Sequence, residues 1–316
     1  MLDALLLLGG LGLLTVAADR FVLGAARLSA ALKVSPVIVG AIVIGFGTSA
    51  PEFLVTILAT LQGSQALAFG NVVGSNTANV LLVLGAAAVV RPLAVATATL
   101  RRELPLMLAA VVLLTLVSID GRVTGLDATV LLVAAVGAIG SIVVVGLRDR
   151  EAAAALTAEV GEYAGAAAPS LARSGLLTVL GLIGTLAGAQ MLVQGAVGLA
   201  RTVGISEAVI GLTIVAIGTS LPELVTAVAA ARRGETDLVV GNILGSNLFN
   251  ALPVAGVAGA LATTQLGTEF RVSLAVMVGA CALAAVLLRS GRQLVRPEGW
   301  VLLAVFVAAT VVVSVA

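Results

Sequence analysis

Long apolar stretches, separated by short polar segments, recur along the whole of this 316-residue chain. A helix needs about 20 mostly apolar residues to cross the hydrocarbon core of a bilayer, and most of these stretches reach that length. Only 10% of the residues are charged, whereas a soluble domain carries about 25%. The chain therefore cannot cover a water-exposed surface with charge, and the sequence predicts an all-α polytopic membrane protein.

Ten transmembrane helices are expected, in two sets of five. A polar segment, residues 148–173, contains charged residues and no apolar run of membrane length, and it separates a first repeat at 1–147 from a second at 174–316. The approximate bounds of the ten helices are residues 2–23, 37–61, 66–90, 104–118, 129–147, 175–200, 208–231, 238–262, 272–288 and 300–316.

The distribution of basic residues predicts the orientation. Cytoplasmic loops of membrane proteins are enriched in Lys and Arg. If the N-terminus is outside, nearly all of the 17 basic residues fall on the cytoplasmic side, and the exceptions are Arg122, Arg201 and Arg271. We therefore expect a protein of the cell membrane (plasma or inner membrane) with both termini outside and a cytoplasmic linker. The 16 acidic residues nearly balance the basic ones, so no nucleic-acid partner is expected.

Two sequence motifs each occur twice, and the copies are separated by the same offset of 171 residues. The motif G-T-S-x-P-E occupies 47–52 and 218–223, and G-N-x-x-G-S-N occupies 70–76 and 241–247. Because each half has an odd number of spans, the second half must enter the membrane from the opposite side. Inverted repeats of this kind are typical of secondary transporters, which bind their substrates near the midplane between discontinuous helices.

The first motif places a glutamate deep in an apolar span in each half, at Glu52 and Glu223. A carboxylate at that depth is costly and indicates function. Pro51 and Pro222 precede the glutamates, and proline removes a helical hydrogen bond. We therefore expect helices 2 and 7 to break here, with backbone carbonyls available to a cation, and helices 3 and 8 to be broken at the second motif.

The neighbouring polar residues offer only hard oxygen ligands. Hydroxyls and amides occur at matching places in the two halves, and Thr48 lies one helical turn before Glu52. The other such residues are Ser49, Ser75, Asn79, Thr219, Ser220, Ser246 and Asn250. Oxygen ligands suit Ca²⁺ and Na⁺ but not soft metals. Two glutamates can be neutralised by one Ca²⁺ or by two Na⁺, so occupancy is mutually exclusive, which is the physical basis of antiport.

At these motifs the sequence resembles the Na⁺/Ca²⁺ exchanger family of the cation/Ca²⁺ antiporter superfamily, in its compact prokaryotic form. The resemblance implies one Ca²⁺ site flanked by Na⁺ sites, and gating by the first and sixth helices sliding over the other eight. The ligands that it implies are Gly45, Thr48, Ser49, Glu52, Ser75 and Asn79 in the first repeat, and Ala216, Thr219, Ser220, Glu223, Ser246 and Asn250 in the second.

One departure from the family pattern is Asn250, where many exchangers carry Asp. The site then has two acids, which leaves the Na⁺ stoichiometry and any K⁺ dependence open. Asn71, Asn76, Asn242 and Asn247 are expected to cap or bridge helices 3 and 8. Asp19 and Arg20 have no charged counterparts in the second half, and an ion pair in or near the membrane is expected for them.

Other functions remain as alternatives. The counter-ion could be H⁺, and the cargo could be Mg²⁺ or Mn²⁺. An intramembrane enzyme would need an activated nucleophile, paired catalytic Asp or a His cluster, and the chain has no His and a single Cys281. A passive channel would not need paired acids in closely packed inverted repeats. No cofactor is expected beyond the transported ions, and the protein is expected to act as a monomer in the lipid bilayer.

Overall fold

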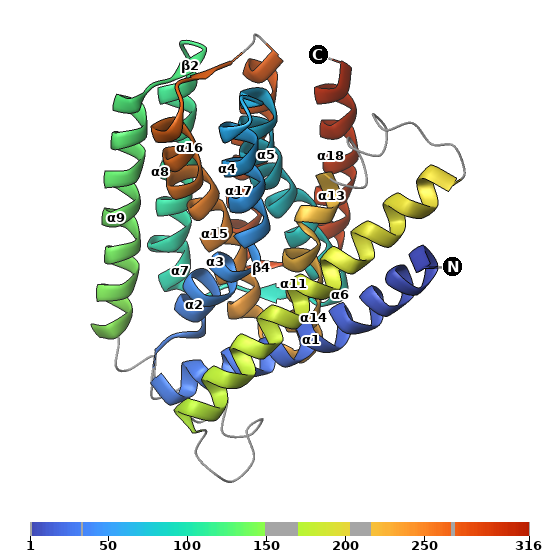
Figure 1. Ribbon diagram of the computed structural model, residues 1–316. Helices are drawn as coiled ribbons and strands as arrows, with labels where there is room; N and C mark the ends of the chain where they lie inside the picture. The colour runs from blue at the N-terminus through green and yellow to red at the C-terminus, as the bar shows by residue number, and fades with distance from the viewer. Residues whose placement is uncertain (1, 33, 149–169, 203–215, 267–268, 316) are drawn as a thin grey trace.

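A computed structural model describes residues 2–32, 34–148, 170–202, 216–266 and 269–315. The chain is helical almost throughout, and most of its helices stand side by side as a bundle (Figure 1). The first half contains α1 (Leu2–Leu32), α2 (Pro36–Val39), η1 (Gly40–Ile44), α3 (Gly45–Thr48), α4 (Ala50–Leu61), α5 (Gln65–Ala78), η2 (Asn79–Val83), α6 (Leu84–Val90), β1 (Leu93–Ala94), α7 (Thr97–Arg101), α8 (Glu103–Ser118), β2 (Arg122–Val123) and α9 (Gly125–Arg148). The second half contains α11 (Leu171–Thr202), α13 (Ala216–Thr219), α14 (Leu221–Arg233), α15 (Thr236–Phe249), η4 (Asn250–Val254), α16 (Ala255–Leu261), β3 (Thr264–Gln265), α17 (Glu269–Ser290), β4 (Gln293–Leu294) and α18 (Arg296–Val315).

The membrane-crossing prediction can be compared with helix lengths. Among the described residues, seven helices are long and apolar enough to cross a membrane, and the bent pair α2–α4 makes an eighth if it is counted as one span. The predicted span 104–118 forms α8, a helix of 16 residues. The predicted span 208–231 begins outside the described residues and continues as α13 and α14. Most of the predicted linker also lies outside the described residues.

Helices α1 and α11 are longer than predicted. They have 31 and 32 residues, or about 46–48 Å at 1.5 Å per residue, whereas the hydrocarbon core is about 30 Å thick. Charged residues such as Asp19 and Arg20 lower the hydropathy of the second half of α1, so the sequence predicts an earlier end, although the helix continues through them. Figure 1 shows both helices crossing the rest of the bundle obliquely, and a tilt accommodates the extra length.

The predicted breaks in helices 3 and 8 take a different form. Each helix continues without a gap through one π-helical turn, η2 in the first half and η4 in the second. Each turn begins at an asparagine, Asn79 or Asn250, and Pro253 within η4 lacks the N–H that an α-helical bond would need. Single π-turns frequently mark functional sites. The local disturbance was expected here, and its physical form is a change of hydrogen-bond register.

The helices α1 and α11 run antiparallel with their backbones in contact. Cβ atoms built on two glycines of α11 would lie 2.5 Å from backbone nitrogens of α1: Gly181 from Phe21, and Gly188 from Leu14. Gly195, seven residues further along, would meet the Leu7 nitrogen in the same way. A glycine at every seventh residue keeps one stripe of α11 free of side chains, which permits this close approach.

Two short β-ribbons connect the halves and display the inverted repeat. β1 pairs with β4, and β2 pairs with β3, both antiparallel. The offset of 171 residues carries β1 onto β3 and β2 onto β4, so the repeat exchanges one ribbon with the other. In Figure 1, β2 lies near the top of the bundle and β4 lies lower, as expected when the second half is inverted.

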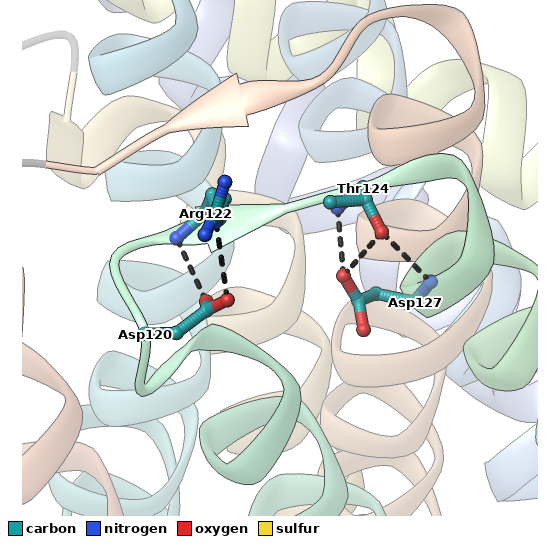
Figure 2. A network of polar contacts seen from close by, with 4 residues as sticks. All are labelled: Asp120, Arg122, Thr124 and Asp127. Atoms are coloured by element: carbon teal, nitrogen blue, oxygen red, sulfur yellow. Dashed lines mark hydrogen bonds and ion pairs between the residues drawn. The ribbon is translucent and has the colours of Figure 1, made fainter.

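The start of α9 illustrates how closely the repeats correspond. Thr124 donates its N–H and its hydroxyl to Asp127 Oδ2, at 2.8 and 2.6 Å, and this capping pair fixes the first turn of the helix (Figure 2). In the second half, the Val295 N–H donates to Glu298 Oε2 at 2.8 Å, at positions 171 residues later. The same turn thus starts α9 and α18.

The helix at the centre of the core is α15, which is almost wholly buried. Two glycines, Gly241 and Gly245, allow α2, η1 and α3 to pack against it, because a Cβ on either would collide with the backbone of Val37 or Ala41. The G-N-x-x-G motif of the second half therefore brings helix 2 of the first half against helix 8. This contact joins the segments that carry the predicted site.

The ion pair expected near Asp19 has a different partner from its sequence neighbour. Arg233, at the end of α14, donates to both carboxylate oxygens of Asp19, at 2.7 and 2.6 Å. Both side chains are partly exposed, so the pair contributes at most about 1 kcal/mol. It links α1 to α14.

We predict that Gly188→Ala destabilises the protein by about 1–3 kcal/mol, because the new methyl group meets backbone that cannot move aside as a side chain can. The matched control is Gly137→Ala on α9, where a Cβ meets nothing within 4 Å. There, helix propensity favours Ala by about 1 kcal/mol. Thermal unfolding in detergent measures both, and equal melting temperatures for the two variants would contradict the assigned packing.

Candidate functional site

Glu52 and Glu223 each lie in the first turn of a helix that starts at a break. Ser49 (φ −80°, ψ 8°) separates α3 from α4, and Ser220 (φ −88°, ψ 5°) separates α13 from α14. The helices on either side of Ser49 are bent by 44°. Proline lies in the first turn of α4 and of α14, where its missing N–H costs nothing. The breaks predicted in helices 2 and 7 are confirmed.

The two halves exchange hydrogen bonds at these breaks. The Ser49 hydroxyl donates to Glu223 Oε1 at 2.9 Å, and the Ser220 hydroxyl donates to Glu52 Oε1 at 3.3 Å. Each serine therefore binds the carboxyl group of the opposite repeat. The two glutamates, 171 residues apart in sequence, are brought to one place in the core.

Each glutamate keeps one oxygen without a partner. Oε2 of Glu52 and Oε2 of Glu223 are buried and form no hydrogen bond with the described residues. Both side chains are only 1% exposed, and neither glutamate is paired with an arginine among those residues. Buried carboxylates without a positive partner are strongly unfavourable. Such a pair needs positive charge, which a bound cation or a proton supplies.

A second contact between the halves involves Gly45 at the start of α3. Its carbonyl accepts the Ser49 N–H at 3.1 Å and the Ser246 hydroxyl at 3.2 Å. Thr48 is fully buried nearby and donates its hydroxyl to the Ile44 carbonyl at 2.9 Å. Four of the predicted ligands, one of them from the second half, thus lie together.

Asn79 and Asn250 occupy equivalent positions at the start of η2 and η4. Both are buried, and neither the amide nitrogen nor the oxygen of either side chain has a hydrogen-bond partner among the described residues. Four unsatisfied amide atoms in a membrane core are exceptional, because buried polar groups are nearly always paired. They are available to a bound ion or water.

The other predicted ligands are less completely placed. Ser75 is buried on α5, and Thr219 is partly buried at the end of α13. Ala216 begins α13 directly after undescribed residues. Its predicted contribution is a backbone carbonyl, and no contact of that carbonyl is described.

The other asparagines of the second motif were expected to cap or bridge helices 3 and 8, and the hydrogen bond from Asn247 on α15 to Asn76 on α5 is such a bridge. Asn71 donates to the Glu52 carbonyl, and Asn247 donates to the Asn76 carbonyl at 3.2 Å. They join neighbouring helices and do not cap helix ends. Only the repetition of the motif could have singled them out, since the sequence does not give the direction of their hydrogen bonds.

The chemistry of the site is that of mixed oxygen donors. Among the described residues there is no group of three or more His, Cys, Asp or Glu side chains that could hold a metal. A Ca²⁺ ion, which takes about six to eight oxygens, would have to combine the two carboxylates with hydroxyls, amides and backbone carbonyls. All three kinds of donor are present around the two helix breaks.

Comparison with known proteins identifies the family. The family model described as "Sodium/calcium exchanger protein" matches residues 2–144 and 173–315, two segments related by the same offset of 171. CaxA of Alkalimonas amylolytica is 39% identical over 313 residues, which cover 97% of each chain. The inner membrane protein YrbG of Escherichia coli is 41% identical over 264 residues, covering 81% of this chain and 79% of YrbG.

A solved structure supports the same assignment. The sodium-calcium exchanger NCX_Mj, soaked with 10 mM Na⁺ and 10 mM Sr²⁺, superimposes with a TM-score of 0.86 at 32% identity, covering 98% of both chains. The fold, the repeat and the whole-length match agree. The chain belongs to the sodium/calcium exchanger family, a family of multi-pass membrane transporters and not of enzymes.

Proposed function

We propose that this protein is a secondary antiporter that exchanges Ca²⁺ for Na⁺ by alternating access at the site of Glu52 and Glu223. The observation that carries the proposal is the reciprocal pair of serine–glutamate hydrogen bonds, which holds two buried carboxyl groups together with an unpartnered oxygen on each. One Ca²⁺ or two Na⁺ would balance the charge of both carboxylates. Since the two loads use the same oxygens, binding of one excludes the other.

The proposed ligands are the twelve residues predicted from the sequence. The supporting observations are the burial of the hydroxyls and amides and the contacts between halves at Ser49, Ser220 and Ser246. The full set is Gly45, Thr48, Ser49, Glu52, Ser75, Asn79, Ala216, Thr219, Ser220, Glu223, Ser246 and Asn250. We propose that the protein acts as a monomer, because both halves of this set come from one chain.

Na⁺ is favoured over H⁺ as the counter-ion by the neutral oxygens around Gly45. A proton needs only a carboxylate, whereas Na⁺ needs several additional oxygens. The Gly45 carbonyl lies within hydrogen-bond distance of the Ser246 hydroxyl, and the Thr48 hydroxyl is bonded to the neighbouring carbonyl of Ile44. The name of NCX_Mj, and its soaking with Na⁺ and Sr²⁺, agree with this choice for a related protein. Exchange of Ca²⁺ for H⁺ is the alternative that the experiment below separates.

We predict that liposomes containing the purified protein and loaded with Na⁺ take up ⁴⁵Ca²⁺ on dilution into Na⁺-free buffer. Glu52→Gln and Glu223→Gln should each lower the initial rate at least about tenfold, because a contact to a charged group contributes about 1.5–3 kcal/mol. Ser118→Ala on α8, a buried hydroxyl bonded within its own helix, is the control and should keep the wild-type rate.

The counter-ion is tested in the same liposomes. Uptake driven by an outward H⁺ gradient, with no dependence on internal Na⁺, would reject Na⁺ and retain the carboxylate site. Uptake that persists in both glutamine variants would reject the site. Single-channel currents in planar bilayers would reject alternating access.

We further propose that the halves are residues 1–147 and 174–316, with a cytoplasmic linker at 148–173 and both termini outside the cell membrane. The basic residues support this orientation, since most of them gather on one side. The ribbon β2–β3 would then face outward and the ribbon β1–β4 the cytoplasm.

Two equivalent positions test this topology. Arg122 on β2 and Gln293 on β4 are both exposed and lie 171 residues apart. In a Cys281→Ala background, we predict that a membrane-impermeant maleimide labels Arg122→Cys on intact cells, and labels Gln293→Cys only after permeabilisation. The reverse pattern would invert the proposed orientation, and labelling of both on intact cells would contradict the arrangement of the ribbons.

A further inference from the structure

The two asparagines that open the repeated G-N-x-x-G-S-N motif form opposite kinds of hydrogen bond. Asn71 uses its amide nitrogen, which donates to the Glu52 carbonyl and to the Thr56 hydroxyl, both at 3.0 Å. Asn242 uses its amide oxygen, which lies 3.4 Å from the hydroxyls of Thr48 and Ser246. Equivalent residues in the two repeats therefore act on different groups.

The sequence around the motifs explains this difference. Thr56, one turn after Glu52, offers Asn71 a hydroxyl, whereas the residue 171 positions later is Ala227, which offers none. Asn71, on α5, is thereby bound to α4 of its own repeat. Asn242 lacks that partner, its amide nitrogen is buried with no partner among the described residues, and its oxygen instead faces groups from both repeats.

The hydroxyl protons near Asn242 each have two acceptors. The Ser246 hydroxyl lies 3.2 Å from the Gly45 carbonyl and 3.4 Å from Asn242 Oδ1. A hydroxyl has one proton and cannot donate to both at once. While it donates to Gly45, that carbonyl is partly occupied. When it donates to Asn242, the Gly45 oxygen and a lone pair of Ser246 are free for another ligand.

We propose that Asn242 is a positioning residue for Na⁺: its side-chain oxygen accepts the hydroxyl proton of Ser246, and this releases the Gly45 carbonyl and the serine oxygen to bind the ion. Thr48 can turn its proton toward Asn242 in the same way. The group of oxygens so formed is neutral, which suits a monovalent cation. The inference rests on the proposed Na⁺-coupled exchange and deepens it.

A consequence is that the two halves of the site differ in their binding of Na⁺. Asn71, the counterpart of Asn242, is instead held by the two hydrogen bonds that its amide nitrogen donates to the Glu52 carbonyl and the Thr56 hydroxyl. Because Thr56 in the first repeat is replaced by Ala227 in the second, the two sides of the site would differ in Na⁺ affinity.

Isothermal titration calorimetry of the purified protein with NaCl measures the Na⁺ affinity without any requirement for transport. Asn242→Ala should weaken Na⁺ binding by about threefold to tenfold, the equivalent of one hydrogen bond, with a smaller change in Ca²⁺ affinity. Asn71→Ala should change both affinities together, because it supports Glu52, which both ions would use. If both asparagines acted only in packing, Asn242→Ala and Asn71→Ala would change the Na⁺ and Ca²⁺ affinities in the same way.

A variant that retains Asn242 provides the second arm. Ala227→Ser supplies the hydroxyl that the second repeat lacks, and we expect it to draw the amide of Asn242 away and weaken Na⁺ binding in the same direction as Asn242→Ala. Unchanged Na⁺ affinity in both variants, or equal loss of Na⁺ and Ca²⁺ affinity in Asn242→Ala, would overturn the inference, as would a wild-type protein that does not bind Na⁺. A wild-type protein that binds Na⁺ but does not exchange it for Ca²⁺ would reject the proposed function alone.

Discussion

The fold is organised around two carboxyl groups that must be held together in an apolar interior. Each is bound by a serine of the opposite repeat, so neither half could complete this arrangement alone. The helix breaks at Ser49 and Ser220 place the glutamates at helix N-termini, where the helix dipole favours negative charge. The glycines of α15 then allow helix 2 to lie against helix 8, which brings Gly45 to Ser246.

Much of this could be predicted from sequence because its causes are local. Apolar runs gave the helices, and the repeated Pro-Glu pair gave both glutamates and the breaks beside them. The parts that could not be predicted depend on contacts between distant residues. Asp19 pairs with Arg233 on another helix, and nothing near Asp19 in the sequence indicates this. Hydropathy does not report hydrogen-bond register, so the π-turns at Asn79 and Asn250 could be anticipated only as disturbances.

The difference between Asn71 and Asn242 shows a further limit of motif reading. Identical motif residues acquire different partners because of Thr56 and Ala227, which lie outside both motifs. The hydroxyl of Thr56, on the neighbouring helix α4, holds the Asn71 amide within its own repeat, whereas Asn242 has no such hydroxyl and lies near groups of both repeats. Functional asymmetry in a duplicated protein can therefore arise from positions that a motif comparison passes over.

The ungapped correspondence of the two halves has a consequence for the energies of the two access states. An inverted repeat of identical halves would make the outward-facing and inward-facing conformations equal in free energy, since the pseudo-two-fold axis exchanges them. Here most elements from α4 to α9 have counterparts at a constant offset, although α7 and α8 together correspond to the single helix α17. The difference therefore arises from non-identical residue pairs and from that interrupted helix. A gap of a few kcal/mol keeps a minor state populated at about 0.1–10%. Under the proposed alternating access, each such pair, of which Thr56 and Ala227 are one, contributes to the balance between the two states.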